Sequence, residues 1–223
     1  TISSTVEKIG SKAFWGINVA ELTIPGSVKE IGSDAFLTGK LSNLTLEEGI
    51  EKIGRRAFKS NSLSEVTIPK SVTKLDKTAF DDNKGINIKY TSLIEILEEA
   101  KNINTEGKAE ENVKALEEAI EAGETINNKA MATLEEVNAA VENITNAING
   151  LEDKPVTYTV RFNVNEEGAT IQVKKGEDVV EPETDGSYNL ESGNYTYIVT
   201  KEGFKDVKGE FTVRDEAKTI EII

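Results

Sequence analysis

The chain has 223 residues, of which 37% are hydrophobic, and it carries a net charge of −14. An acidic chain lacks the basic surface that nucleic acids and anionic membranes require, so we expect no nucleic-acid partner. Cysteine and histidine are both absent, which excludes disulfides, zinc–thiolate sites and the Ser–His–Asp and Cys–His catalytic arrangements.

No apolar run approaches the ~20 residues that a membrane-spanning helix needs, so we expect no direct membrane insertion. Thr1 is not an initiator methionine, and no stretch resembles a signal peptide. We therefore expect a mature or excised piece of a longer protein, with any secretion signal or wall anchor outside this sequence.

Residues 1–90 contain four segments that align at a fixed step of 22 residues. A short strand-like element, such as Leu22-Thr-Ile24-Pro25, repeats in the same register. A repeat of this size cannot bury its own apolar side chains, but stacking places equivalent residues in columns that complete one core. The segments begin at Val6, Val28, Ile50 and Val72, and their Ala-Phe pairs end at Phe14, Phe36, Phe58 and Phe80.

This pattern closely resembles the BspA-like leucine-rich repeats of bacterial surface proteins. The resemblance implies a right-handed solenoid with a parallel sheet on one face, and a role in adhesion or partner binding. Gly10, Gly32 and Gly54 are predicted to allow a tight turn. Because the repeats begin at the chain terminus, we expect them to be the end of a longer binding solenoid.

In residues 91–154 the aliphatic residues recur every three or four positions, which is the spacing of amphipathic helices. Breaks near 104–107 and 127–132 predict three antiparallel helices that bury their apolar stripes by forming a bundle. Thr133 and Glu136 have the spacing of a capping box at the start of the third helix. The stretch contains fifteen acidic and five basic residues, which we interpret as solvated helix faces.

Three alanine-rich segments of this helical stretch carry a second resemblance. They are similar to a FIVAR-like module, a three-helix unit found in many secreted bacterial proteins. The segments are Leu116-Glu-Glu-Ala-Ile120, Glu136-Val137-Asn-Ala-Ala-Val141 and Ala147-Ile148-Asn-Gly-Leu151.

After Pro155 the apolar residues alternate with polar ones along short runs, which predicts about six or seven antiparallel strands in a small β-sandwich. Gly168-Ala169-Thr-Ile-Gln-Val, Tyr188-Asn-Leu-Glu-Ser-Gly193 and Lys201-Glu-Gly203-Phe204 resemble a PEGA-like or related immunoglobulin-like surface module. The predicted fold class is multidomain α+β. Its parts are a leucine-rich-repeat solenoid in residues 1–90, a three-helix bundle in 91–154 and a β-sandwich in 155–223.

The concave face of the solenoid is the candidate ligand-binding site. Residues that alternate with buried ones along each predicted strand face outward, and their carboxylate, amide and hydroxyl groups can bind sugar hydroxyls or peptide donors. The alternative is that the threonines are simply good exposed strand residues and that the polar column only solvates the sheet. The two columns are Glu21, Asn43, Glu65 and Asn87, and Thr23, Thr45, Thr67 and Lys89.

Other polar clusters are assigned no chemistry. Asp81-Asp82-Asn83 has oxygen ligands that suit calcium, but it lacks the twelve-residue loop with a distal glutamate, so we expect a turn and no metal. Paired carboxylates such as Glu98-Glu99 belong to polar helix faces, so we assign no catalytic residue and no cofactor. Trp15 is expected to be partly exposed or to cover the end of the solenoid.

We therefore expect a non-enzymatic bacterial protein, cell-surface or secreted and monomeric, that acts in adhesion or protein–protein interaction. Its partner would be a host or bacterial surface protein or an extracellular glycan, and the later modules would serve as a stalk or as accessory binding units. The alternative is an accessory region of a larger extracellular enzyme, with carbohydrate binding by one module as a further hypothesis. FIVAR-like and β-sandwich modules commonly decorate such enzymes.

Overall fold

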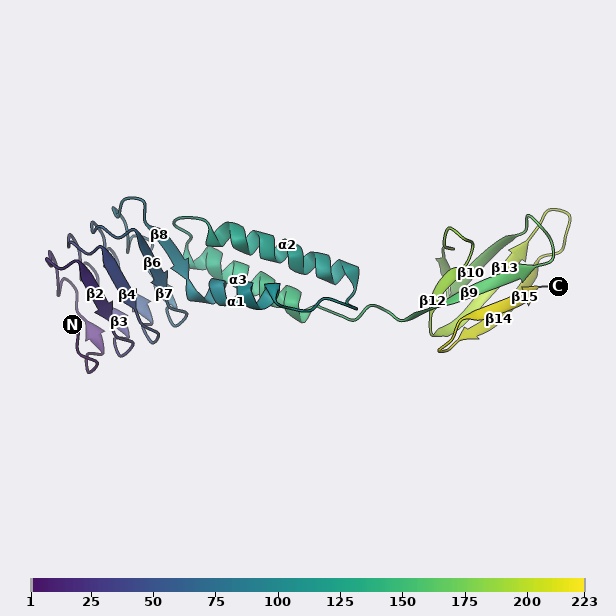
Figure 1. Ribbon diagram of the computed structural model, residues 1–223, viewed down its shortest axis with the longest axis horizontal. Helices are drawn as coiled ribbons and strands as arrows, with labels where there is room; N and C mark the ends of the chain where they lie inside the picture. Colours follow the sequence, from purple (N-terminus) through teal and green to yellow (C-terminus); the bar gives the residue numbers. More distant parts are fainter. Residues whose placement is uncertain (1, 223) are drawn as a thin grey trace. The chain divides into compact units, whose positions relative to one another are not determined.

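The computed structural model describes residues 2–222, and its contacts divide the chain at residue 152 into two compact units. Within the described residues, the first unit contains eight short strands and three helices, and the second contains seven strands (Figure 1). The chain is thus a mixed α+β protein with a solenoid-like repeat region, three helices and several β-sheets.

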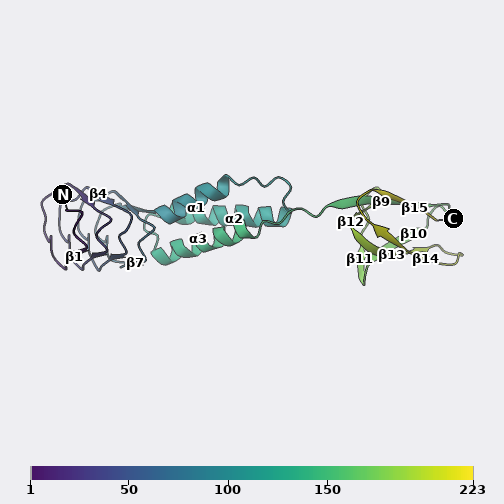
Figure 2. The ribbon, with the colours of Figure 1, turned by 90° about the horizontal axis from the view of Figure 1, so that it is seen from below.

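The first unit begins with four coils that stack through two sets of parallel strands. Two-residue strands pair in the order β1-β3-β5-β7, while β2 pairs with β4 and β6 with β8. The two sets lie on opposite sides of the coils (Figure 2). In each of these parallel strand pairs, a residue lies opposite the one 22 positions later, as Lys8 lies opposite Glu30. The strands are β1 (Lys8–Ile9), β2 (Glu21–Ile24), β3 (Glu30–Ile31), β4 (Asn43–Leu46), β5 (Lys52–Ile53), β6 (Glu65–Ile68), β7 (Lys74–Leu75) and β8 (Asn87–Tyr90).

The core of the coils consists of columns to which each repeat contributes the same residue. The clearest column is aromatic: Phe14, Phe36, Phe58 and Phe80 stack with successive ring centroids 5.1, 5.1 and 5.3 Å apart. Phe36 and Phe58 are fully buried, whereas Phe14 is 38% exposed because it belongs to the first coil. The structure confirms that this column is core.

Gly32 lies where the neighbouring coil passes too close for any side chain. A Cβ atom there would lie 2.6 Å from Ser11 N and 2.7 Å from Gly10 C. Gly10, Gly32 and Gly54 all have negative φ, so none of them needs the left-handed backbone that favours glycine. At Gly32 and Gly54 the requirement for glycine comes from the spacing between coils, and not from the turn that the sequence suggests.

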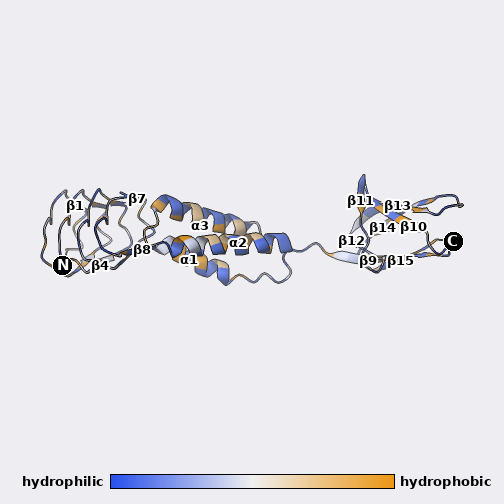
Figure 3. Ribbon diagram, turned by 90° about the horizontal axis from the view of Figure 1, so that it is seen from above, coloured by the Kyte–Doolittle hydropathy of each residue, from blue (hydrophilic) through white to orange (hydrophobic). Residues whose placement is uncertain are grey.

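Three helices follow the last coil directly. Thr133 and Glu136 form the predicted capping box, in which Thr133 Oγ1 accepts from Glu136 N at 3.2 Å and the Glu136 carboxylate accepts from Thr133 N at 2.9 Å. Hydrophobic and hydrophilic segments alternate along the helices (Figure 3), and the helices contact one another along their apolar stripes. The helices are α1 (Thr91–Lys101), α2 (Glu110–Asn127) and α3 (Leu134–Asn149).

The coils and the helices share one hydrophobic core. Tyr90 of β8, Leu93 of α1 and Ala132 before α3 belong to the same buried cluster as Phe80. The sequence places a domain boundary between residues 90 and 91 because the apolar spacing changes there. A change in apolar spacing marks a new local structure. A compact unit, however, is defined by its buried core, and the core of the coils continues into the helices.

The second unit contains two β-sheets that share a smaller core. One sheet has the order β11-β10-β13-β14 with antiparallel pairs, and the other has the order β12-β9-β15. Val160, Val173 and Tyr188 are buried in this core, where Phe162 meets Tyr188 edge-on with ring centroids 5.7 Å apart. The strands are β9 (Thr157–Val164), β10 (Thr170–Lys175), β11 (Asp178–Val180), β12 (Tyr188–Glu191), β13 (Gly193–Thr200), β14 (Val207–Val213) and β15 (Lys218–Ile222).

Strand β15 differs from the antiparallel expectation. It pairs with β9 in parallel, with Ile220 opposite Phe162 and Ile222 opposite Val164. The preceding strand, β14, belongs to the other sheet, so the chain crosses between the sheets before it enters alongside β9. Alternating apolar residues predict a strand but not its direction, because side chains alternate in the same way in both kinds of pairing.

Phe36→Ala is expected to lower the free energy of unfolding of the first unit by about 3–5 kcal/mol, the usual effect of truncating a buried phenylalanine. Phe14→Ala should have a clearly smaller effect, because the Phe14 ring is 38% exposed and stacks on Phe36 alone among the described rings. Urea unfolding followed by the fluorescence of Trp15, the single tryptophan, measures both variants. Equal losses of stability would contradict this prediction.

Candidate functional site

The residues predicted to form the binding face lie on the four-residue strands. The positions between them point into the core along β4 and β6, as the alternation predicts. Strands β4 and β6 are neighbours, so both columns cross all four coils (Figure 1). The register aligns Glu21 with Asn43, Thr23 with Thr45, Glu65 with Asn87 and Thr67 with Lys89.

Six of these side chains, those on the first three coils, are exposed. Within residues 2–222 they form no side-chain hydrogen bond and no ion pair, so their polar atoms are available to a partner. The columns contain no aromatic residue on which a sugar ring could stack. We call this surface the outer strand face, and it consists of Glu21, Thr23, Asn43, Thr45, Glu65 and Thr67.

The fourth coil is different because the loop between α2 and α3 covers it. Lys89 Nζ donates a hydrogen bond to Asn127 O at 2.5 Å, where its positive charge also suits the C-terminal end of α2. Ile88 N donates to Ala130 O at 2.9 Å. Asn87 and Lys89 are consequently half-buried. We therefore remove these two predicted residues from the candidate face, since the Lys89 ammonium group holds the helices against the coils.

Tyr90 holds the same loop from inside the core. Its Oη donates to Ala132 O at 2.7 Å, and the side chain is only 3% exposed. Burial raises the pKa of Tyr90 to about 12, and the negative charge of Glu136 adds to the effect. The phenol therefore stays neutral and continues to donate its hydrogen bond at pH values where a free tyrosine begins to ionise.

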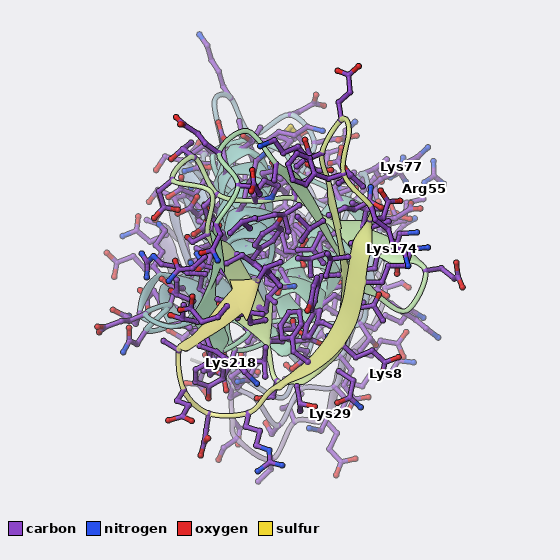
Figure 4. The ribbon with its side chains drawn as sticks, turned by 90° about the vertical axis from the view of Figure 1, so that its right-hand side faces the viewer. Lys8, Lys29, Arg55, Lys77, Lys174 and Lys218 are labelled. Carbon is purple, nitrogen blue, oxygen red and sulfur yellow. The ribbon has the colours of Figure 1, made fainter. Side chains whose placement is uncertain are left out.

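An ion-pair column that the sequence analysis did not predict runs along the two-residue strands. Lys8 Nζ and Lys52 Nζ contact the Glu30 carboxylate at 2.8 and 3.0 Å, and their hydrogen bonds lower the pKa of Glu30. Lys74 continues the column beside Lys52 but has no acidic partner among the described residues. The Lys8 side chain lies at the outer edge of the view in Figure 4. The signal was present in the sequence, because these charged residues recur at the repeat period.

Asn61 is a second polar residue that the sequence analysis did not single out. Its Nδ2 donates to Phe36 O at 2.8 Å and to Phe58 O at 2.9 Å, and its Oδ1 accepts from Leu41 N at 3.1 Å. The side chain thus joins the backbones of two successive coils inside the core. Asn83 repeats the same arrangement one coil later.

The triplet Asp81-Asp82-Asn83 does not gather around a cation. Asn83 is 5% exposed and turned inward to the backbone, while Asp82 pairs with Lys59 at 3.1 Å. In the part of the chain that the structure describes, no group of three or more acidic side chains is placed to hold a metal ion. None of the helices described there combines the length and the apolar character that crossing a bilayer requires.

Trp15 lies on the first coil and is 53% exposed. Its Nε1 donates to Thr38 Oγ1 at 2.9 Å, and Lys12 Nζ lies 5.0 Å from the ring centroid. The indole is thus partly exposed, as predicted, and it links the first coil to the second.

Comparison with known families agrees with this architecture over the first part of the chain. Residues 1–104 match the model of the BspA type leucine rich repeat region (6 copies). The match continues past the four coils and includes helix α1.

No curated protein is similar enough to the chain to count as a match. The chain is 15% identical, with a TM-score of 0.27, to a solved structure of the CBM51-2 and INT domains of ZmpB from Clostridium perfringens. The similarity covers 55% of this chain and 51% of that one, so the chain spans about half the length of the solved structure. A similarity at this TM-score indicates neither the fold nor the ligand of this chain.

Asn61→Ala should lower the free energy of unfolding by about 2–4 kcal/mol, because it leaves two carbonyl groups and one N–H group unpaired inside the core. Asn143→Ala, on an exposed position of α3, is the control and should stay within about 0.5 kcal/mol of the wild type. Urea unfolding monitored by Trp15 fluorescence compares the two. A near-neutral Asn61→Ala variant would show that water or rearrangement satisfies these groups.

Tyr90→Phe should lower the free energy of unfolding by about 1–2 kcal/mol, because Ala132 O loses its donor in the core. The Tyr90 pKa rises from 10.0 to about 12 on folding, so the neutral phenol favours the folded state. This contribution is complete below pH 10 and is lost as the pH rises towards 12. Urea unfolding on both sides of pH 10 should therefore show a steeper decline in the wild type than in Tyr90→Phe. Parallel declines would contradict the assignment.

Proposed function

We propose that this chain is a non-enzymatic, protein-binding region of a bacterial cell-surface or secreted protein. The observation that carries the proposal is the outer strand face, whose six exposed polar side chains have no partner within residues 2–222. The ladders between coils hold these side chains in two columns at a constant spacing. A partner therefore meets a pre-organised array, and little conformational entropy is lost on binding.

The chemistry of the outer strand face favours a protein partner over a sugar. Glu21 and Glu65 present carboxylates, Asn43 lies in the same column, and the threonines of the second column supply hydroxyl groups. Carboxylates attract lysine and arginine side chains, so a host or bacterial surface protein with a basic patch fits this face. The absence of aromatic residues from both columns makes a carbohydrate platform the weaker candidate.

The match to the BspA-type region supports a position outside the cell, since proteins with these repeats are typically bacterial surface proteins. We propose that the helices form a FIVAR-like three-helix bundle and that the second unit is a PEGA-like or immunoglobulin-like β-sandwich. Both would act as a stalk or as accessory binding units for a monomeric protein. The two sheets that share a core and the mutual contacts of the helices support this arrangement.

An array of host extracellular-matrix proteins, bacterial surface proteins and glycans, probed with the full chain, tests the proposal. The triple variant Thr23→Arg, Thr45→Arg and Thr67→Arg fills the outer strand face with long side chains. It should bind the protein partner about tenfold more weakly or worse, which corresponds to about 1.4 kcal/mol. Biolayer interferometry measures the affinities, and circular dichroism verifies that the variant is folded.

A matched control carries the same change in charge on exposed helix positions, as Ala115→Arg, Asn143→Arg and Asn146→Arg. It should bind as the wild type does. An equal loss of affinity in both triple variants would show that binding depends on net charge. A wild-type chain that binds nothing on the array would contradict the proposal. Binding confined to glycans would favour the carbohydrate alternative instead.

A further inference from the structure

The end face of the fourth coil is covered on one side only. On the β8 side, the loop between α2 and α3 closes the strand edge through Ala130. On the β7 side, an open hollow of about 890 Å³ lies between helix α3 and the second to fourth coils, and it reaches back to Ser33. We call this hollow the end groove, and it is lined by Lys52, Lys74 and Leu75 on the solenoid wall and by Leu134, Glu135 and Asn138 on the helix wall.

Strand β7 ends its ladder with unused hydrogen-bond acceptors. One coil earlier, Glu51 O accepts from Thr73 N at 3.0 Å, and Ile53 O accepts from Asp76 N at 3.0 Å. The equivalent acceptors of the last coil are Thr73 O and Leu75 O, which receive no hydrogen bond from residues 2–222. A strand edge with free carbonyl groups is a template for one more strand.

The interior of the end groove has room for an aliphatic side chain. Ile53 is buried beneath the next coil, but Leu75, its counterpart in the last coil, is only half-buried. A crevice of about 270 Å³ opens beside Leu75, with Phe80, Met131 and Leu134 in its lining. Met131 is 45% exposed, and its unbranched thioether side chain can adjust to a residue that enters.

The charges along the groove favour one acidic residue on the added strand. The column Lys8, Glu30, Lys52 alternates in sign, but Lys74 then repeats the sign of Lys52 and meets no acid among the described residues. An acidic side chain on the next strand would lie beside Lys74 and restore the alternation, as opposite charges across strands favour each other. Glu135 on the helix wall disfavours a longer acidic run.

We infer that the end groove binds an extended segment of a partner protein, with the pattern acidic–aliphatic–glycine, as a fifth strand parallel to β7. The acidic residue lies beside Lys74, and the aliphatic residue enters the crevice beside Leu75. Glycine is the third residue of the pattern because Gly32 and Gly54 take this position in the second and third coils, where a Cβ atom would lie 3.0 Å or less from the neighbouring backbone; the fourth coil has Asp76 there, so this position is the least restrictive of the three. N–H groups of the segment donate to Thr73 O and Leu75 O, as coil four donates to coil three.

The second coil supplies the probe, because Glu30-Ile31-Gly32 has this pattern. A capped peptide with the sequence of residues 27–33, Ser-Val-Lys-Glu-Ile-Gly-Ser, is titrated into the ¹⁵N-labelled full chain. The amide signals of Leu75, Asp76 and Met131 should shift and saturate, with a dissociation constant on the order of 1 mM. The same peptide with lysine in place of glutamate should bind about three to ten times more weakly.

Lys74→Glu tests the register, because it reverses the charge that the acidic residue meets. This variant should prefer the lysine peptide over the glutamate peptide. Lys84→Glu changes the net charge equally at an exposed position outside the groove lining, and it should keep the wild-type preference. An unchanged preference in Lys74→Glu, signals that shift only outside the groove, or no shift with either peptide up to about 10 mM would overturn the inference.

The end groove is separate from the outer strand face, so the two proposals fail independently. The triple arginine variant of Thr23, Thr45 and Thr67 should bind the glutamate peptide with wild-type affinity. A loss of peptide binding in that variant would place the peptide on the outer strand face and overturn the end-groove assignment.

Discussion

The close stacking of successive 22-residue coils is the constraint on which the rest of the first unit depends. The rings of Phe36 and Phe58 lie 5.1 Å apart, close to the ~4.7–4.9 Å that separates hydrogen-bonded strands. Every column must repeat at that spacing, because the backbone ladders of the coils allow no other. At this distance two main chains touch, which leaves no room for a side chain at Gly32. A substitution of a residue that packs between two coils therefore changes the packing of both coils.

The same contact decides which polar groups are buried and which are free. Between coils, Asn61 satisfies backbone groups of two repeats, and a buried polar side chain of this kind is stable only when each of its groups is paired. On the outside, the alternation of strand residues leaves Glu21, Thr23 and their equivalents without partners among the described residues. A stack of coils thus offers a partner two kinds of surface, the faces where columns emerge and the ends where ladders stop.

The fourth coil shows how an end can be closed in part. Lys89 and Tyr90 both donate to carbonyl groups at the junction of α2 and α3, so the helices complete the β8 side of the stack. The β7 side receives no such donor from the described residues and borders an open hollow. Open ends of repeat proteins require a cap because unpaired strand edges attract further strands. Here the cap and the proposed end groove lie side by side at one end of the stack.

The sequence alone determined the repeat period, the aromatic column, the three helices and the capping box at Thr133, because each depends on residues close together in one repeat or one helix. It also predicted that Glu21, Thr23 and their equivalents on the next two coils face outward, but not that Asn87 and Lys89 are half-buried. Only the tertiary structure decided that Lys89 holds a helix, that Asn61 links two coils and that β15 runs parallel to β9. These features join residues that are distant in the chain. The periodicity of the sequence does not indicate which distant residues contact one another.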